Sequence, residues 1–116
     1  MSEIYDLFQQ GKSHLKKGRP AQATVALEKA KRRAPDKASI REALGIAYFR
    51  IHRYEEAASE FREMLELAPN DDYAHYALGR SLEKLGRDHE ANEHYKLASS
   101  LRPGSSTYEV RIRDLD

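Results

Sequence analysis

The side chains of this sequence best suited to chemistry are two histidines, His89 and His94, with Glu90 and Glu93 between them. A zinc-protease helix carries its two histidines at positions i and i+4, so that both imidazoles face one metal ion. Here the two histidines are five positions apart, which places the imidazoles on different faces of a helix. We therefore expect no metal site in this segment.

No other arrangement of residues points to catalysis. The chain has no cysteine, so disulfides, thiolate catalysis and cysteine-based zinc sites are excluded. Serine, histidine and aspartate are all present, but no segment has the pattern of a nucleophile elbow, a glycine-rich phosphate loop or paired carboxylates in a cleft. We expect a protein that is not an enzyme and that binds no cofactor.

The charged residues do not indicate a nucleic-acid partner. Among 116 residues, 20 Lys and Arg stand against 19 Asp and Glu, which gives a net charge of +1. The densest basic run comprises Lys29, Lys31, Arg32 and Arg33, with Lys37 close by. Cations at the end of a helix interact favourably with its dipole, and the run lacks the interleaved aromatic residues of a nucleic-acid-binding module. We expect a solvated helix end here and no nucleic-acid partner.

The chain also lacks membrane signals. No apolar run approaches the roughly 20 residues that cross a bilayer. The first residues include Ser2, Glu3 and Asp6 and lack the basic and then apolar pattern of a signal peptide. We expect a cytoplasmic protein with no membrane partner.

The elements that would position any functional residue follow a strict repeat. Three glycines, three alanines, three prolines and a bulky residue each recur every 34 residues. These positions are Gly11, Gly45 and Gly79, Ala23, Ala57 and Ala91, Pro35, Pro69 and Pro103, and Leu27, Phe61 and Tyr95. A fixed period of this size indicates stacked supersecondary units rather than one globular core.

Each period contains two helical stretches. In the second unit, apolar residues fall at i, i+3, i+4, i+7, i+8 and i+11 from Ile40, which is the stripe of an amphipathic helix. We predict helices at about 3–17, 21–34, 37–51, 54–68, 71–85 and 88–101. Gly18 and Gly86, with His52 at the equivalent place, suit left-handed helix ends. Asp71 supplies a capping oxygen, and the repeated prolines end the second helices.

The repeated glycines predict close helix packing. They lie on the apolar face of the first helix of each unit, where a glycine costs roughly 1 kcal/mol relative to alanine. We expect them to permit a close helix–helix approach, with the bulky residues of the repeat filling the space beside them and the repeated alanines offering a shallow facing surface.

Leu44-Gly45, Leu78-Gly79 and Tyr48, together with the repeated alanine, bulky and proline positions, resemble the tetratricopeptide repeat (TPR) family. The leading aromatic residue of the family pattern is absent, and Gln10 replaces the leucine of the first unit. The resemblance covers about residues 4–105. It implies an all-α fold, a right-handed α-solenoid of three repeats at about 4–37, 38–71 and 72–105, within a single domain spanning 1–116.

The same resemblance implies a concave groove lined by the first helix of each repeat. Its positions hold Tyr5, Phe8, Lys12, Ile46, Phe49, Arg50, Tyr73, Tyr76 and Arg80. The implied function is a protein–protein interaction scaffold or adaptor that binds a partner peptide or helix in this groove. Aromatic residues would bury apolar ligand side chains while Lys12, Arg50 and Arg80 orient an acidic group. Alternatively, the aromatic residues pack partly within the chain and the cations only solvate a helical face.

One known use of the family is not expected. Members that capture the tails of heat-shock chaperones resemble one another in a two-carboxylate clamp of lysine, asparagine and arginine residues. The matching positions here are Phe8, Lys12, Ala43, Tyr73 and Ala77, of which only Lys12 is cationic. We therefore expect a different ligand.

The last residues, 106–116, allow two interpretations. Ser106 and Glu109 fit a capping box, and Tyr108, Ile112 and Leu115 have helical spacing, which predicts a short capping helix. The same residues also alternate between apolar and charged, as in an extended arm. An arm or an uncovered repeat end would favour an alternative function, a self-assembling structural subunit. A chaperone-like role, wrapping a client helix, is a variant of the groove hypothesis. We expect a monomer or a weak homo-oligomer.

Overall fold

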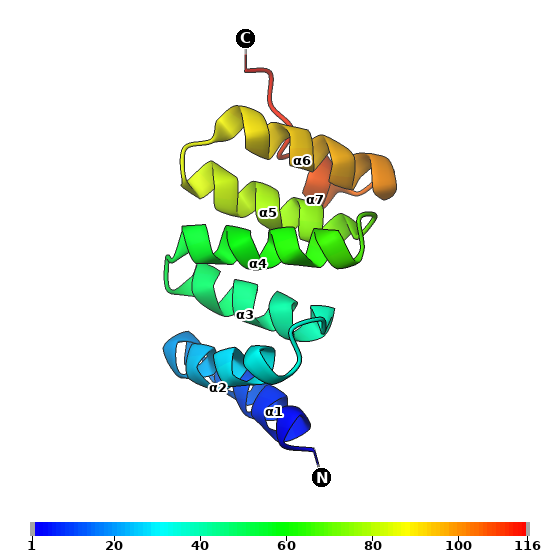
Figure 1. Ribbon diagram of the computed structural model, residues 1–116. Coiled ribbons are helices and arrows are strands. Elements are labelled where there is room, and N and C mark those ends of the chain that lie inside the picture. The colour runs from blue at the N-terminus through cyan, green and yellow to red at the C-terminus, as the bar shows by residue number, and fades with distance from the viewer. Residues whose placement is uncertain (1, 116) are drawn as a thin grey trace.

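The computed structural model describes residues 2–115 as a stack of antiparallel helices (Figure 1). Six long helices follow one another along the stack, and the two termini lie at its opposite ends. The helices are α1 (Glu3–Lys16), α2 (Pro20–Arg33), α3 (Ala38–Arg50), α4 (Tyr54–Leu67), α5 (Asp72–Lys84), α6 (Asp88–Leu101) and the short α7 (Ser106–Glu109). No strand occurs among these residues, so the predicted all-α repeat fold is confirmed.

The first helix of each repeat ends in the same way. Gly18, His52 and Gly86 have φ of 72°, 63° and 78°, the left-handed conformation that the sequence predicts at these positions. The backbone N–H one residue further on donates to a carbonyl five residues earlier, for example Arg53 to Tyr48 O at 2.9 Å. The Asp71 carboxylate caps α5 by accepting from Ala74 N at 3.1 Å, which also confirms the prediction. These local signals fix the two-helix unit.

The three repeated glycines let paired helices approach closely. A Cβ built on Gly11 would lie 2.4 Å from Leu27 Cγ, one on Gly45 2.7 Å from Phe61 Cζ, and one on Gly79 2.6 Å from Tyr95 Cε1. These bulky partners lie on the second helix of each repeat and are almost fully buried. The predicted pairing of glycine with a bulky residue is therefore confirmed in all three repeats.

Neighbouring repeats are joined by one buried carboxylate. Glu60 on α4 is 4% exposed and accepts from Lys31 Nζ at 2.9 Å and from Arg41 at 3.0 Å. Arg41 also donates to Pro35 O at 3.0 Å. Lys31 belongs to the basic run of α2, and Arg33 of the same run pairs with Glu3. Part of this run thus holds helices together rather than standing free in solvent.

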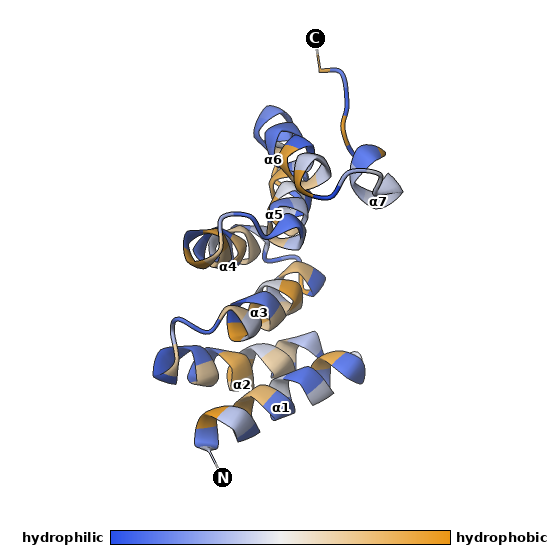
Figure 2. Ribbon diagram, turned by 90° about the vertical axis from the view of Figure 1, so that its right-hand side faces the viewer, coloured by the Kyte–Doolittle hydropathy of each residue, from blue (hydrophilic) through white to orange (hydrophobic). Residues whose placement is uncertain are grey.

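The C-terminal segment folds back on the third repeat. Figure 2 shows α7 beside α5 and α6, before the chain continues as an extended segment. Tyr108 of α7 is buried and donates a hydrogen bond to Asp72 at 2.6 Å, and burial with this bond raises the pKa of the Tyr108 phenol to about 12. Asn92 and Arg113 exchange two hydrogen bonds of 2.8 and 2.9 Å.

Both interpretations of this segment are therefore partly correct. A helix forms, but it is only four residues long, and the residues after it are extended and docked. The predicted capping box is wrong, because the helix begins after Ser105 and no side chain caps it. Asp116, the last residue of the predicted cap or tail, lies outside the described residues, as does Met1.

Candidate functional site

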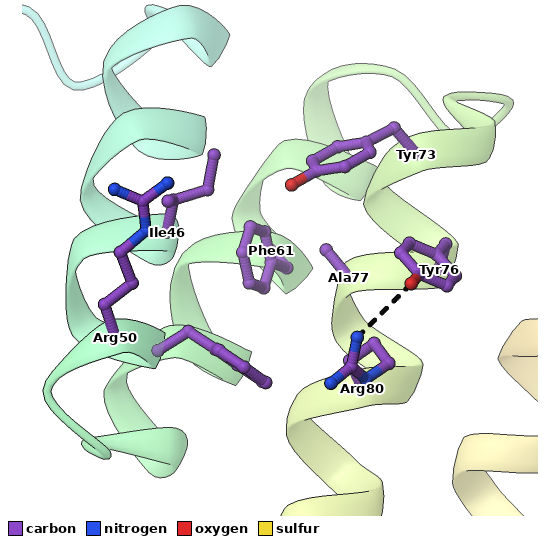
Figure 3. Close-up of a pocket in the computed structure, with 8 residues that line it drawn as sticks. Ile46, Arg50, Phe61, Tyr73, Tyr76, Ala77 and Arg80 are labelled. Carbon is purple, nitrogen blue, oxygen red and sulfur yellow. Dashed lines mark hydrogen bonds between the residues drawn. The ribbon is translucent and has the colours of Figure 1, made fainter. Parts of the chain in front are cut away.

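One hollow on the groove side lies between α3 and α5 (Figure 3). We call it the aromatic pocket; its volume is about 140 Å³. It is lined by Ile46, Phe49, Arg50, Phe61, Tyr73, Tyr76, Ala77 and Arg80. In Figure 3, Ile46 and Arg50 stand on one side, the residues from α5 on the other, and Phe61 at the back. Six of these residues belong to the groove that the sequence predicts, so the repeat brings them together.

The helical register explains this convergence. On α3, Ile46, Phe49 and Arg50 are spaced i, i+3, i+4, and on α5 Tyr73 and Tyr76 have the same three-residue step. Such residues lie on one face of a helix. Because α3 and α5 are the first helices of successive repeats, the stack turns these two faces toward the same hollow.

The two arginines of the aromatic pocket are held by neutral groups. Arg50 donates to Leu15 O at 3.1 Å, and Arg80 donates to the Tyr76 hydroxyl at 3.3 Å. The Arg80 guanidinium also lies over the Phe49 ring, 5.4 Å from its centroid. Its Nε is buried and has no hydrogen-bond partner. The pocket therefore combines positive charge with an apolar floor.

The tyrosines of the aromatic pocket also pack against other side chains of the protein. Tyr76 lies 6.1 Å from the Tyr95 ring and 5.1 Å from the Tyr108 ring, measured between centroids. Tyr73 is half-buried, and this burial, with the nearby Glu42 carboxylate, raises its phenol pKa. Because Tyr108 of the short α7 packs against Tyr76, these aromatic residues pack partly within the chain, which is the alternative that the sequence left open.

A second hollow continues the groove toward α1. We call it the α1–α3 pocket; it has a volume of about 330 Å³ and is lined by Phe8, Lys12, Leu15, Ser39, Glu42, Ala43 and Ile46. Ile46 lines both pockets, so the two are neighbours along the groove. Lys12 Nζ lies 5.1 Å from the Phe8 ring centroid. Burial, and then repulsion from Asp71, raises the pKa of the Glu42 carboxyl.

Eight of the predicted groove residues line one of these two pockets, and Tyr5 lines neither. Tyr5 lies in the first turn of α1 and is 53% exposed. Phe61 is the pocket residue that sequence reasoning missed as a binding residue. Its place on a second helix predicts packing beside Gly45, and it does pack there, but the other side of its ring forms the pocket floor.

A histidine pair also escaped the sequence reasoning. His75 and His94 stack, with Nδ1 to Nδ1 at 3.0 Å, and His75 Nε2 lies 2.9 Å from Pro69 O. Since a carbonyl only accepts, His75 donates from Nε2 and accepts at Nδ1 from His94. These positions lie 34 residues after Arg41 and Glu60, so the repeat could have revealed the pair. His94 thus pairs with His75 rather than His89.

Within residues 2–115, no group of three or more His, Cys, Asp or Glu side chains could hold a metal ion. No helix in that range has both the length and the apolar character needed to cross a membrane.

The paired helices, the repeated glycine contacts and the groove along the first helices define an α-helical repeat protein. Residues 8–72 and residues 73–105 each match the tetratricopeptide repeat. The chain therefore belongs to the tetratricopeptide repeat family, as its 34-residue pattern predicts.

One curated relative is the mouse (Mus musculus) superkiller complex protein 3. It is 32% identical over 95 residues, which make up 82% of this chain and 6% of the mouse protein. The chain thus spans only a small part of that relative's length.

Solved structures with the same fold include MamA and two domains of RPAP3 proteins. MamA has a TM-score of 0.91 at 26% identity, over 94% of this chain and 64% of that one. The first TPR of Spaghetti (RPAP3), bound to an HSP90 peptide, has a TM-score of 0.90 at 21% identity, over 96% and 88% of the two chains. The second TPR domain of human RPAP3, in complex with an HSP70 peptide, has a TM-score of 0.89 at 20% identity, over 95% of this chain and 92% of that one.

Proposed function

We propose that this protein is an interaction scaffold that binds a peptide or helix of a partner protein in the groove formed by the aromatic pocket and the α1–α3 pocket. The observation that carries the proposal is the aromatic pocket itself. It offers four aromatic side chains and two arginines, residue types that most often supply binding energy at protein interfaces. Among the predicted groove residues, Phe8 and Lys12 extend the same surface toward α1. We expect no catalytic activity.

The RPAP3 structures named above contain heat-shock peptides, which supports peptide binding as the class of function for this fold. The same ligand is not proposed for this chain. The positions that would form a carboxylate clamp hold Phe8, Ala43, Tyr73 and Ala77, which line the two pockets with largely apolar surface. Only Lys12 is cationic. The groove therefore suits a more apolar ligand segment.

A library of random 12-residue peptides displayed on phage, selected on the wild-type protein, would test the groove. Enriched peptides would be synthesised and their affinities measured by fluorescence anisotropy. Ile46→Glu places a charge where the two pockets meet, and Val25→Glu is the matched control because Val25 is 58% exposed on α2. We expect affinities weakened about tenfold or more by Ile46→Glu only. The absence of enriched peptides, or equal binding by both variants, would refute the proposal.

Self-assembly is the alternative function. In the structure the C-terminal segment covers part of the third repeat. At the other end of the stack, Leu7 and Val25 line a hollow of the first repeat. The molecular mass measured by sedimentation at several concentrations, with and without residues 105–116, would detect association through either end. A mass that stays monomeric at all concentrations would exclude it. The predicted cytoplasmic location stays a prediction, which fractionation of cells expressing the tagged chain would check.

A further inference from the structure

Two arginines of the aromatic pocket lack the anionic partner that most arginines of this protein have. Arg41, Arg62 and Arg87, for example, each pair with a glutamate at 3.0–3.1 Å. Neither Arg50 nor Arg80 forms an ion pair with any residue between 2 and 115. Their hydrogen bonds go to a carbonyl and to a hydroxyl. The pocket therefore has unused capacity to bind an anion.

Of the two arginines, Arg80 is the better candidate to donate hydrogen bonds to an anion. It is half-buried against Phe49, and its Nε has no acceptor. A buried N–H without an acceptor destabilises the unliganded protein, and a carboxylate that accepts from the guanidinium fork would remove this penalty. Arg50, on the opposite wall, adds to the positive potential.

The size and lining of the pocket specify a second feature of the ligand. Three of its lining residues, Ile46, Phe61 and Ala77, have no polar side-chain atoms. An apolar cavity of about 150 Å³ accommodates a benzene molecule. The volume here, about 140 Å³, therefore suits one aliphatic or aromatic side chain.

We propose that the aromatic pocket recognises an acidic–apolar pair in the ligand: an Asp or Glu side chain bound at Arg80 and a neighbouring Leu, Ile, Met or Phe in the pocket. This inference rests on the proposed function and names the ligand class. The acid is a side chain rather than a chain terminus. Members of this family that bind a chain terminus hold its carboxylates with a clamp of lysine, asparagine and arginine side chains, and of the matching positions here only Lys12 is cationic.

The sequences of the peptides selected on the wild-type protein provide the first test. We expect enrichment of Asp or Glu directly beside Leu, Ile, Met or Phe. Peptides that depend on the groove but carry no such acidic residue would overturn this inference and leave the proposed function intact. Peptides that ignore the Ile46→Glu change would refute both.

A double-mutant cycle gives the sharper test. The best acidic peptide and its Asp→Asn or Glu→Gln version would be titrated against wild type and Arg80→Gln. Each single change should weaken binding about tenfold. The two changes together should weaken it hardly more than either one alone, because both remove the same contact. Additive losses would overturn the proposal.

Two controls separate specific recognition from general charge. Arg32→Gln removes an exposed arginine of α2 that also has no ion pair with a described residue and lies outside both pockets. It should leave the affinity unchanged, and an equal loss would overturn the assignment to Arg80. Amidating the peptide's C-terminus should also have no effect, whereas a tenfold loss would identify a terminal carboxylate as the bound group and refute the side-chain assignment.

Discussion

Replacing Gly45 by alanine tests the link between the repeat pattern and the groove. A Cβ at this position would lie 2.7 Å from both Cε1 and Cζ of Phe61, closer than two carbons can pack. Phe61 is only 2% exposed, and its side chain lines the aromatic pocket. We expect the added methyl group to push the ring toward that pocket.

The magnitude follows from two opposing effects on the free energy of unfolding. Overpacking a core by one carbon costs about 1–3 kcal/mol, and alanine regains about 1 kcal/mol of helix propensity over glycine. Gly45→Ala should therefore lose up to about 2 kcal/mol of stability, although the same change in an exposed helix would stabilise the protein. Urea unfolding followed by circular dichroism measures the difference. A variant more stable than wild type would refute the close-packing argument.

Gly18→Ala provides a matched control for this experiment. Gly18 has φ of 72° and no atom within 4 Å of a built Cβ, so alanine there costs about 1 kcal/mol through backbone strain alone. Both variants should lose comparable stability, but only Gly45→Ala should weaken a peptide selected on the groove. Equal peptide affinity in the two variants would show that the Phe61 ring does not form part of the binding surface.

Three further predictions concern the buried polar contacts. Burial and the facing His75 lower the pKa of His94. Since the folded state then binds fewer protons than the unfolded one, stability should fall as the pH drops below about 6.5. In urea titrations His94→Gln should show a smaller loss of stability between pH 7.5 and pH 5.5. Tyr108→Phe removes the hydrogen bond to Asp72 and should lower stability by about 1 kcal/mol, with an unchanged unfolding midpoint counting against a docked C-terminal segment. Glu60→Ala leaves its two cationic partners unpaired and should lower stability by about 3 kcal/mol. A loss below about 0.5 kcal/mol in chemical denaturation would contradict the role of Glu60 in joining the repeats.

Much of the fold could be predicted because its determinants are local or periodic. The left-handed ends at Gly18, His52 and Gly86 depend on a few consecutive residues. The pairing of Gly45 with Phe61 repeats in all three units, so each copy supports the interpretation of the others. The groove register is what the resemblance to the tetratricopeptide repeat family implies, and most of the groove residues predicted in this way line one of the two pockets.

The candidate site was less predictable where its side chains meet others without a repeated counterpart. Helical register gives the direction of Tyr76, but not that Tyr108 would return from the chain's end to pack against it. Register likewise assigns Phe61 to the core, and only the spacing of α3 and α5 leaves one side of its ring open. Charge counting does not reveal that the Arg80 Nε has no hydrogen-bond partner.

The sequence by itself thus determined the helices, their ends and the stacking order, because a 34-residue period constrains each of these through neighbours in the chain, whereas the groove face came from the resemblance to the tetratricopeptide repeat family. Only the tertiary structure decided how deep the aromatic pocket is, how the last residues dock, and that His75 and His94 share a hydrogen bond. Each of these depends on the distance between side chains from different helices. That distance is set by packing across the stack, which one-dimensional spacing does not encode.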